Sequence, residues 1–162
     1  MGYEIRLTFQ DIIQAGEAAQ MSVYQRDWNH KSRQNMKVLD WNAMLYGWMG
    51  QLAVGKYHYG DDSYDLREWV LKYDDLPDGA EVRVSMKKIL WIKEYDAPDQ
   101  MYWMIYPIEE NRLWLMGSVC RSQVDHLKKR YKDTERFTVS FVDYKPYLTD
   151  VHAPMRGGRV LA

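Results

Sequence analysis

The sequence predicts an α/β (α+β) domain in which one mixed central β-sheet is flanked by helices. Apolar residues recur at helical spacing in two stretches near the N-terminus. The middle of the chain is rich in β-branched and aromatic residues and is divided by turn signals. The expected order is two helices, four strands, a short helix and a last strand. With 162 residues, the chain is expected to form a single domain over residues 1–162.

Two helices are expected before the strands. The first follows Thr8, a favourable N-cap residue, and carries Asp11 in its first turn. The second is expected from about residue 35 to residue 59, and Gly60 suits the position after its last turn. A glycine inside a helix costs roughly 1 kcal/mol relative to alanine, so another element should pack closely against the second helix. Its internal glycines are Gly47, Gly50 and Gly55.

The strands are expected mainly between Trp69 and Val119. The four candidate segments are EWVLKY, EVRVSMKKILWI, MYWMIYPI and RLWLMGSV, with DLPDGAE and EYDAPDQ as turns. Ser122 is expected to cap a short helix, SQVDHLKKRY, and FTVSFV is the expected last strand. Residues 151–162 are expected to form a poorly ordered tail.

Composition limits the functional classes. The formal net charge of −1 excludes a strongly basic overall field, so any nucleic-acid surface must be a local patch. The single cysteine excludes a disulfide framework and favours a reducing compartment. No apolar stretch approaches the ~20 residues that span a bilayer, and the N-terminus lacks the apolar run of a signal peptide. These observations predict a soluble cytoplasmic protein without a membrane partner.

The segment DLPDGAEVRVSMKK carries the strongest chemical signal. Side chains alternate across a strand, so Glu81 and Arg83 share one face, while Val82 and Val84 should enter the core from an interior strand. Asp75 or Asp78 would supply one carboxylate and Glu81 a second, and the carbonyl of Val82 could complete the protein's share of a Mg²⁺ shell. Mn²⁺ would serve as a substitute.

The role of the guanidinium in this segment is limited by its chemistry. Arg83 could stabilise charge on a phosphate, but it cannot act as a base because guanidinium stays protonated. The structural alternative for the same residues is a solvent-facing strand edge with alternating charge.

The order of motifs over residues 35–150 resembles that of the PD-(D/E)XK, or restriction-endonuclease-like, superfamily, and in particular its small phage-borne members. The shared features are the helix segment GWMGQLAVGK, the acidic turn before Glu81-Val82-Arg83, the strand pair ILWIKEYDAPDQMYWMIYPI, the strand RLWLMGSV, a short helix and a closing strand. The resemblance implies a restriction-endonuclease-like fold and a Mg²⁺-dependent DNA endonuclease in which Gln51 assists. In two positions the sequence departs from the family: Gln51 stands where Glu is common, and Arg83 stands where Lys is usual.

The resemblance also implies DNA as a partner, held by basic residues through its phosphates. The candidates are Arg26, Lys31, Arg33, Lys37, Lys87, Arg121, Lys128, Lys129 and Arg130. The alternative is a non-catalytic binding protein on the same fold, such as a phage factor that binds DNA or inhibits a host defence protein, with no cofactor. The near-zero net charge and the surplus of Trp and Tyr favour that alternative. The oligomeric state, including a homodimer, stays open.

Overall fold

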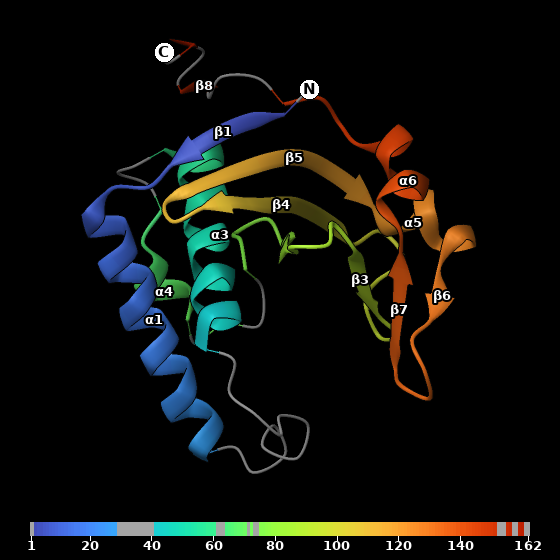
Figure 1. Cartoon of the computed structure of the whole chain (residues 1–162), viewed down its shortest axis with the longest axis horizontal. Helices are drawn as coiled ribbons and strands as arrows, with labels where there is room; N and C mark the ends of the chain where they lie inside the picture. The colour runs from blue at the N-terminus through green and yellow to red at the C-terminus, as the bar shows by residue number, and fades with distance from the viewer. Residues whose placement is uncertain are drawn as a thin grey trace.

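A computed structural model describes residues 2–28, 41–60, 64–70, 72, 75–151, 155–156 and 159–160, with side chains described in 2–22, 41–60, 64–70, 72 and 75–151. Its helices are α1 (Phe9–Trp28), α3 (Trp41–Tyr59), α4 (Leu66–Trp69), α5 (Arg121–Val124), α6 (Phe141–Tyr144) and the 3₁₀ turns η1 (Asp125–Leu127) and η2 (Lys145–Tyr147). Its strands are β1 (Tyr3–Arg6), β2 (Glu81–Val84), β3 (Leu90–Lys93), β4 (Met101–Glu109), β5 (Arg112–Cys120), β6 (Lys129–Arg130), β7 (Arg136–Val139), β8 (Met155–Arg156) and β9 (Arg159–Val160). Figure 1 shows their arrangement.

Some of the sequence-based predictions fall outside the described part of the chain. The first turns expected for the second helix, residues 35–40, are among them, and so is most of the predicted tail at 151–162. The side chains of four basic candidates are also outside it: Arg26, Lys31, Arg33 and Lys37.

The strands form a four-stranded mixed sheet in the order β1-β5-β4-β2 and a three-stranded sheet in the order β3-β7-β6. The strand β2 runs parallel to β4, whereas the other pairs are antiparallel. The α+β class is therefore confirmed, but the expectation of one central sheet is wrong. The predicted long strand EVRVSMKKILWI is divided by a turn in which Lys88 has a φ of 57° and donates its N–H to the carbonyl of Ser85. This turn directs β3 to β7.

The four-stranded sheet has a hydrophobic core on each face. On one face, α1 and α3 pack on residues that include Val82, Ile105 and Leu115. On the other face, Tyr102 and Met104 pack with the inner residues of the three-stranded sheet and with α5 and α6. The molecule is thus layered, with α1 and α3 on one side of the large sheet and the small sheet, α5 and α6 on the other (Figure 1).

The strand β2 is the terminal strand of its sheet in the described chain, not the interior strand that the sequence predicted. The alternation of its side chains is nevertheless confirmed for Val82, which is buried against α3, while Val84 is half-buried. A Cβ atom on Gly50 would lie 2.2 Å from Cγ2 of Val84. The absence of a side chain at Gly50 therefore lets α3 approach β2 closely.

The predicted start of α1 and the predicted end of α3 are confirmed. Thr8 and Asp11 form a reciprocal cap, because each accepts the other's backbone N–H on its side chain, at 3.2 and 2.9 Å. At the other end of α3, Gly60 has a φ of 90° and donates its N–H to the carbonyl of Lys56. The close packing inferred from the helix glycines holds for Gly50 and for Gly55, which meets Tyr64. A Cβ atom on Gly47, by contrast, would meet no neighbouring group of the described residues within 4 Å.

Three short elements differ from the prediction. The segment EWVLKY begins within helix α4, whose first turn is capped by the carboxylate of Asp65. The segment FTVSFV ends as a strand at Val139, and α6 follows Ser140. The segment SQVDHLKKRY is helical only through Leu127 and then enters β6. The predicted cap at Ser122 is wrong, because α5 begins at Arg121 and Cys120 is its N-cap residue. The strand β1, which has four residues, was not predicted, and it pairs with β5.

Candidate functional site

The candidate site lies at the start of β2, where the acidic turn meets the open edge of the large sheet. Ser85 donates its N–H to Ile105 of β4. Because backbone groups alternate along a strand, the N–H of Val82 faces away from β4. The carboxylate of Asp75 accepts this N–H at 2.8 Å. The turn residue is therefore fixed at the edge of the strand by its own side chain.

Asp75 and Glu81 form a pair of interacting carboxyl groups. Burial, together with the negative charge of Glu81, raises the pKa of Asp75 from 3.8 to about 7, against the lowering effects of the Val82 N–H and Arg83. The side chain of Glu81 is 16% exposed. Asp75 therefore keeps its proton to a much higher pH than a carboxyl group in water does.

The guanidinium of Arg83 connects this pair to the second sheet. It donates from Nη1 to Oε2 of Glu81 at 3.0 Å and from Nε to the carbonyl of Trp91 in β3 at 3.1 Å. Its Nη2 lies 3.7 Å from Oδ2 of Asp96 but is buried without a hydrogen-bond acceptor among the residues that the structure describes. Arg83 is therefore held between two acids, with one N–H group unsatisfied.

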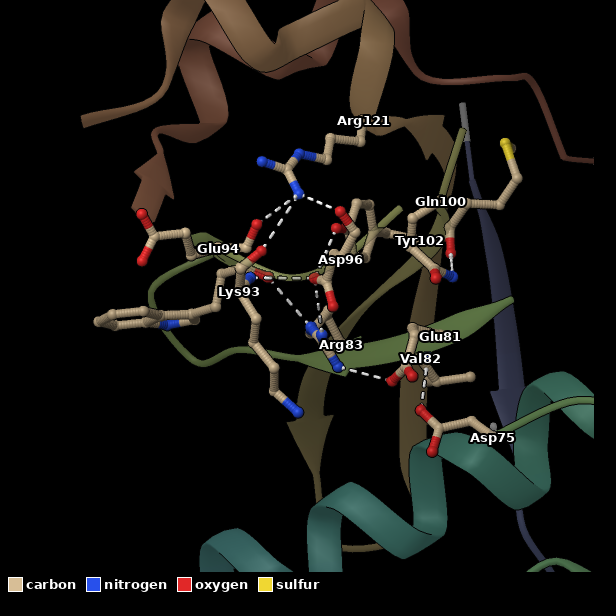
Figure 2. A network of polar contacts seen from close by, with 12 residues as sticks. Asp75, Glu81, Val82, Arg83, Lys93, Glu94, Asp96, Gln100, Tyr102 and Arg121 are labelled. Carbon is tan, nitrogen blue, oxygen red and sulfur yellow. Dashed lines mark hydrogen bonds and ion pairs between the residues drawn. The ribbon is translucent and has the colours of Figure 1, made fainter. Parts of the chain in front are cut away.

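Asp96 belongs to the same polar network (Figure 2). Its Oδ2 accepts the hydroxyl of Tyr102 at 2.7 Å and the N–H of Lys93 at 2.9 Å. Arg121 donates from Nη1 to the carbonyls of Lys93, Glu94 and Asp96, and from Nε to Oδ1 of Asp125 at 3.1 Å. The network thus extends from the end of β5, through the turn after β3, to the start of β2.

Gln51 contacts the backbone of Asp75, not its carboxylate. Its Nε2 donates to the carbonyl of Asp75 at 2.9 Å and to the hydroxyl of Tyr64 at 3.1 Å. The hydroxyl of Tyr64 donates to the same carbonyl at 2.9 Å. Gln51 is 4% exposed. It therefore positions the acidic turn against α3, and Tyr64, which sequence reasoning missed, shares that task.

Of the two alternative turn acids, the structure brings Asp75 to Glu81. Asp78 accepts the N–H of Ala80 at 3.0 Å, and its Oδ2 lies 3.9 Å from Nε2 of His58, with 46% of the side chain exposed. No group of three or more His, Cys, Asp or Glu residues with metal-binding geometry occurs within the described ranges. The acidic pair at the start of β2 is accordingly a two-carboxylate arrangement.

The predicted phosphate-binding residues have different environments. Arg121 is 8% exposed and is held by carbonyl groups, while Lys128 pairs with Asp125 at 2.8 Å and lies over the ring of Phe137. Arg130 pairs with Glu94 at 3.3 Å. Lys87 and Lys129 are exposed, and their side chains form no ion pair or hydrogen bond with the part of the chain that is described.

Within the described segments, no helix is both long and apolar enough to cross a membrane. Comparison of the chain with protein-family models, with curated proteins and with solved structures gives no match.

Proposed function

We propose that the protein is a Mg²⁺-dependent DNA endonuclease of the PD-(D/E)XK type, with Asp75 and Glu81 as its acidic pair. The observation that carries this proposal is the meeting of a turn carboxylate and a strand carboxylate at the start of β2, with Asp75 fixed by the N–H of Val82. A restriction-endonuclease-like core is part of the proposal. It is supported by the contact of Gln51, in the glycine-rich helix, with the acidic turn.

The acidic pair suits a hard divalent cation. Carboxylate oxygens are the preferred protein ligands of Mg²⁺, which keeps several waters and commonly takes one or two carboxylates. Two carboxyl groups that repel each other when ionised would gain from a positive ion between them. When bound, Mg²⁺ lowers the pKa of water and neutralises charge that develops on a phosphate. Mn²⁺ fits the same oxygen ligands.

The remaining residues would act on the phosphate and on the position of the acids. The positive charge of Arg83, whose Nη1 donates to Glu81, would stabilise negative charge on a phosphate bound at the acidic pair. Arg83 cannot take up a proton, so the attacking water must lose its proton to another group. Gln51 and Tyr64 hold the backbone of Asp75 and thereby set the distance between its carboxylate and that of Glu81.

A plasmid-cleavage assay tests the proposal. Supercoiled plasmid is incubated with the protein and Mg²⁺, Mn²⁺ or EDTA, and nicked and linear forms are separated on a gel. We expect metal-dependent cleavage that falls at least 100-fold in Glu81→Gln and in Asp75→Asn. The matched control is Asp78→Asn, which changes a neighbouring acid of the same turn and should retain activity. Cleavage that persists in Glu81→Gln, or an intact plasmid with both metals, would contradict the proposal.

A second candidate is a non-catalytic binding protein, either DNA-binding or directed at a host defence protein. The observation that favours it is the position of Arg83, whose charge is already engaged by Glu81 and lies near Asp96. In this case the same charges serve to link the two sheets. The plasmid would stay intact, whereas Glu81→Gln would lower the stability of the fold, as measured by urea denaturation.

A further inference from the structure

The outer face of the three-stranded sheet combines aromatic and basic side chains. Alternate residues of β3 and β7 are buried on the inner face, namely Leu90, Ile92, Phe137 and Val139. The partners in register on the opposite face are Trp91 with Thr138, Lys93 with Arg136, and Thr138 with Lys129. This face therefore presents one indole and three cations on a small sheet.

Two adjoining cavities extend along this face. The larger, of about 820 Å³, lies between the first turns of α3, the connection from β2 to β3, and the side chains of Trp91 and Tyr131. The smaller, of about 590 Å³, is lined by Lys93, Tyr95, Tyr131 and Arg136, and by residues 133–135 of the β6–β7 hairpin. Tyr131 borders both cavities and packs edge-on against Trp91, with ring centroids 4.9 Å apart. The two cavities thus lie on either side of one aromatic pair, and together they are called the groove.

The cations of this groove form no ion pairs with the described residues. The side chains of Lys87, Lys93, Lys129 and Arg136 form no ion pair or hydrogen bond within the described chain. Lys93 and Arg136 lie directly opposite each other in register, an arrangement that is unfavourable for two like charges. The larger cavity is lined by Lys87 and by no acidic side chain among the described residues, whereas Asp133 and Glu135 lie at the hairpin end of the smaller one. The unpaired cations point to an anionic ligand.

We propose that this groove binds single-stranded nucleic acid. Unpaired bases can stack on Trp91 and Tyr131, and on Tyr95, which is 73% exposed. Phosphates contact the four unpaired cations of this face, namely Lys87, Lys93, Lys129 and Arg136. A duplex keeps its base faces stacked inside the helix and cannot use these rings. Ser85 borders the groove directly after the end of β2, two residues beyond Arg83 in the chain. Delivery of the bound strand to the acidic pair rests on the proposed function, but binding does not.

The test is fluorescence anisotropy with labelled dT15, rU15 and a 15-base-pair duplex, in EDTA so that cleavage cannot interfere. We expect both single strands to bind more tightly than the duplex, and the ratio of dT15 to rU15 to report whether the ligand is DNA or RNA. The logarithm of the binding constant should fall with the logarithm of salt concentration with a slope of about −3 for four phosphate contacts. Tyr131→Ala should weaken dT15 binding about tenfold or more through lost stacking.

The charge test uses matched double variants. Lys93→Glu with Arg136→Glu replaces one like-charged cross-strand pair by another, so the electrostatic cost within the sheet stays similar. This variant should weaken binding at least tenfold and reduce the salt slope by about half. The control is Arg67→Glu with Lys72→Glu, which makes the same change in net charge at and after α4. We expect that control to bind within about twofold of the wild type.

The outcomes separate this inference from the proposed function. Binding of dT15 by a protein that does not cleave plasmid supports the groove and rejects the nuclease. Cleavage that is unaffected by the Lys93 and Arg136 double variant, together with absent dT15 binding at low salt, rejects the groove and leaves the nuclease. Equal losses in the test and control variants, or preference for the duplex, would also overturn the inference. Unfolding transitions of each variant, followed by circular dichroism, verify that the fold is retained.

Discussion

The acidic pair at the start of β2 makes a specific prediction for Asp75→Asn. The asparagine carbonyl can keep the hydrogen bond that Asp75 accepts from Val82, while its amide can donate to Glu81. The substitution therefore removes a negative charge next to Glu81 without removing an acceptor. We expect the variant to be more stable than the wild type at high pH and close to it at low pH.

The magnitude follows from the pKa of Asp75, which burial and Glu81 raise from 3.8 to about 7. Because the folded-state value is the higher one, the folded protein binds more protons between these two pH values, and stability falls as the pH rises through that window. Ionisation of the buried Asp75 destabilises the folded wild type fully at pH 8, whereas at pH 4 Asp75 is protonated and this destabilisation is largely absent. A difference of about three pKa units sets a ceiling of about 4 kcal/mol on the stabilisation by Asp75→Asn at pH 8.

Urea denaturation followed by tryptophan fluorescence at pH 5, 6, 7 and 8 measures this difference. The quantity to compare is the free energy of unfolding of the variant minus that of the wild type, because other titrating groups cancel. It should rise with pH and level off near pH 8. Asp78→Asn is the control, since its half-exposed side chain should give a small difference at every pH. A difference for Asp75→Asn that does not change with pH, or that is negative at pH 8, would refute the coupling between Asp75 and Glu81.

Four further substitutions test how the surrounding fold is held. Gly50→Ala places a Cβ atom 2.2 Å from Val84 and should lower the free energy of unfolding by about 1–3 kcal/mol. Gly47→Ala adds a Cβ atom with no described neighbour within 4 Å, so it should raise the free energy of unfolding by up to about 1 kcal/mol. Urea denaturation of both variants measures these changes. Lys56→Met leaves Asp11 buried without its ion-pair partner and should cost about 3 kcal/mol at pH 7. Burial alone would raise the pKa of Asp11, but Lys56 and Thr8 lower it overall. The destabilisation by Lys56→Met should therefore shrink as the pH falls below 3.8, because Asp11 then becomes protonated. An unchanged destabilisation in acid would argue against the ion pair of Lys56 with Asp11. Gln51→Glu removes the donor to the Asp75 carbonyl at a position that is 4% exposed, and it should lower the free energy of unfolding by about 2 kcal/mol or more. A variant as stable as the wild type in thermal melts would mean that Gln51 does not position the turn.

The parts of the site that depend on local geometry could be predicted from the sequence. Alternation along a strand placed Glu81 and Arg83 on one face and Val82 on the other. The cap of α1 by Thr8 and Asp11 is equally local. The sequence could not decide between Asp75 and Asp78 as the partner of Glu81, because that depends on the path of the turn and on its contacts with Gln51 and Tyr64.

The parts that depend on the partner of each strand could not be predicted. Asp96 reaches Arg83 only because the left-handed backbone at Lys88 sends β3 into a second sheet. Propensity gave no signal for that turn, since lysine rarely adopts a positive φ. The groove on the outer face likewise depends on the register of β3 with β7, which brings Lys93 opposite Arg136. Alternation within each strand could have indicated these outward residues, but not their partners across the sheet.

The open edges of β2 and β3 have a consequence for self-association. Unpaired N–H and C=O groups at a sheet edge invite strands from other copies of a protein to add, and this is a common route to aggregates. Here the carboxylate of Asp75 occupies the N–H of Val82, and the guanidinium of Arg83 occupies the carbonyl of Trp91. The side chains of Asp75 and Arg83 therefore occupy backbone groups at which intermolecular strand pairing would begin, and the same two side chains belong to the candidate site.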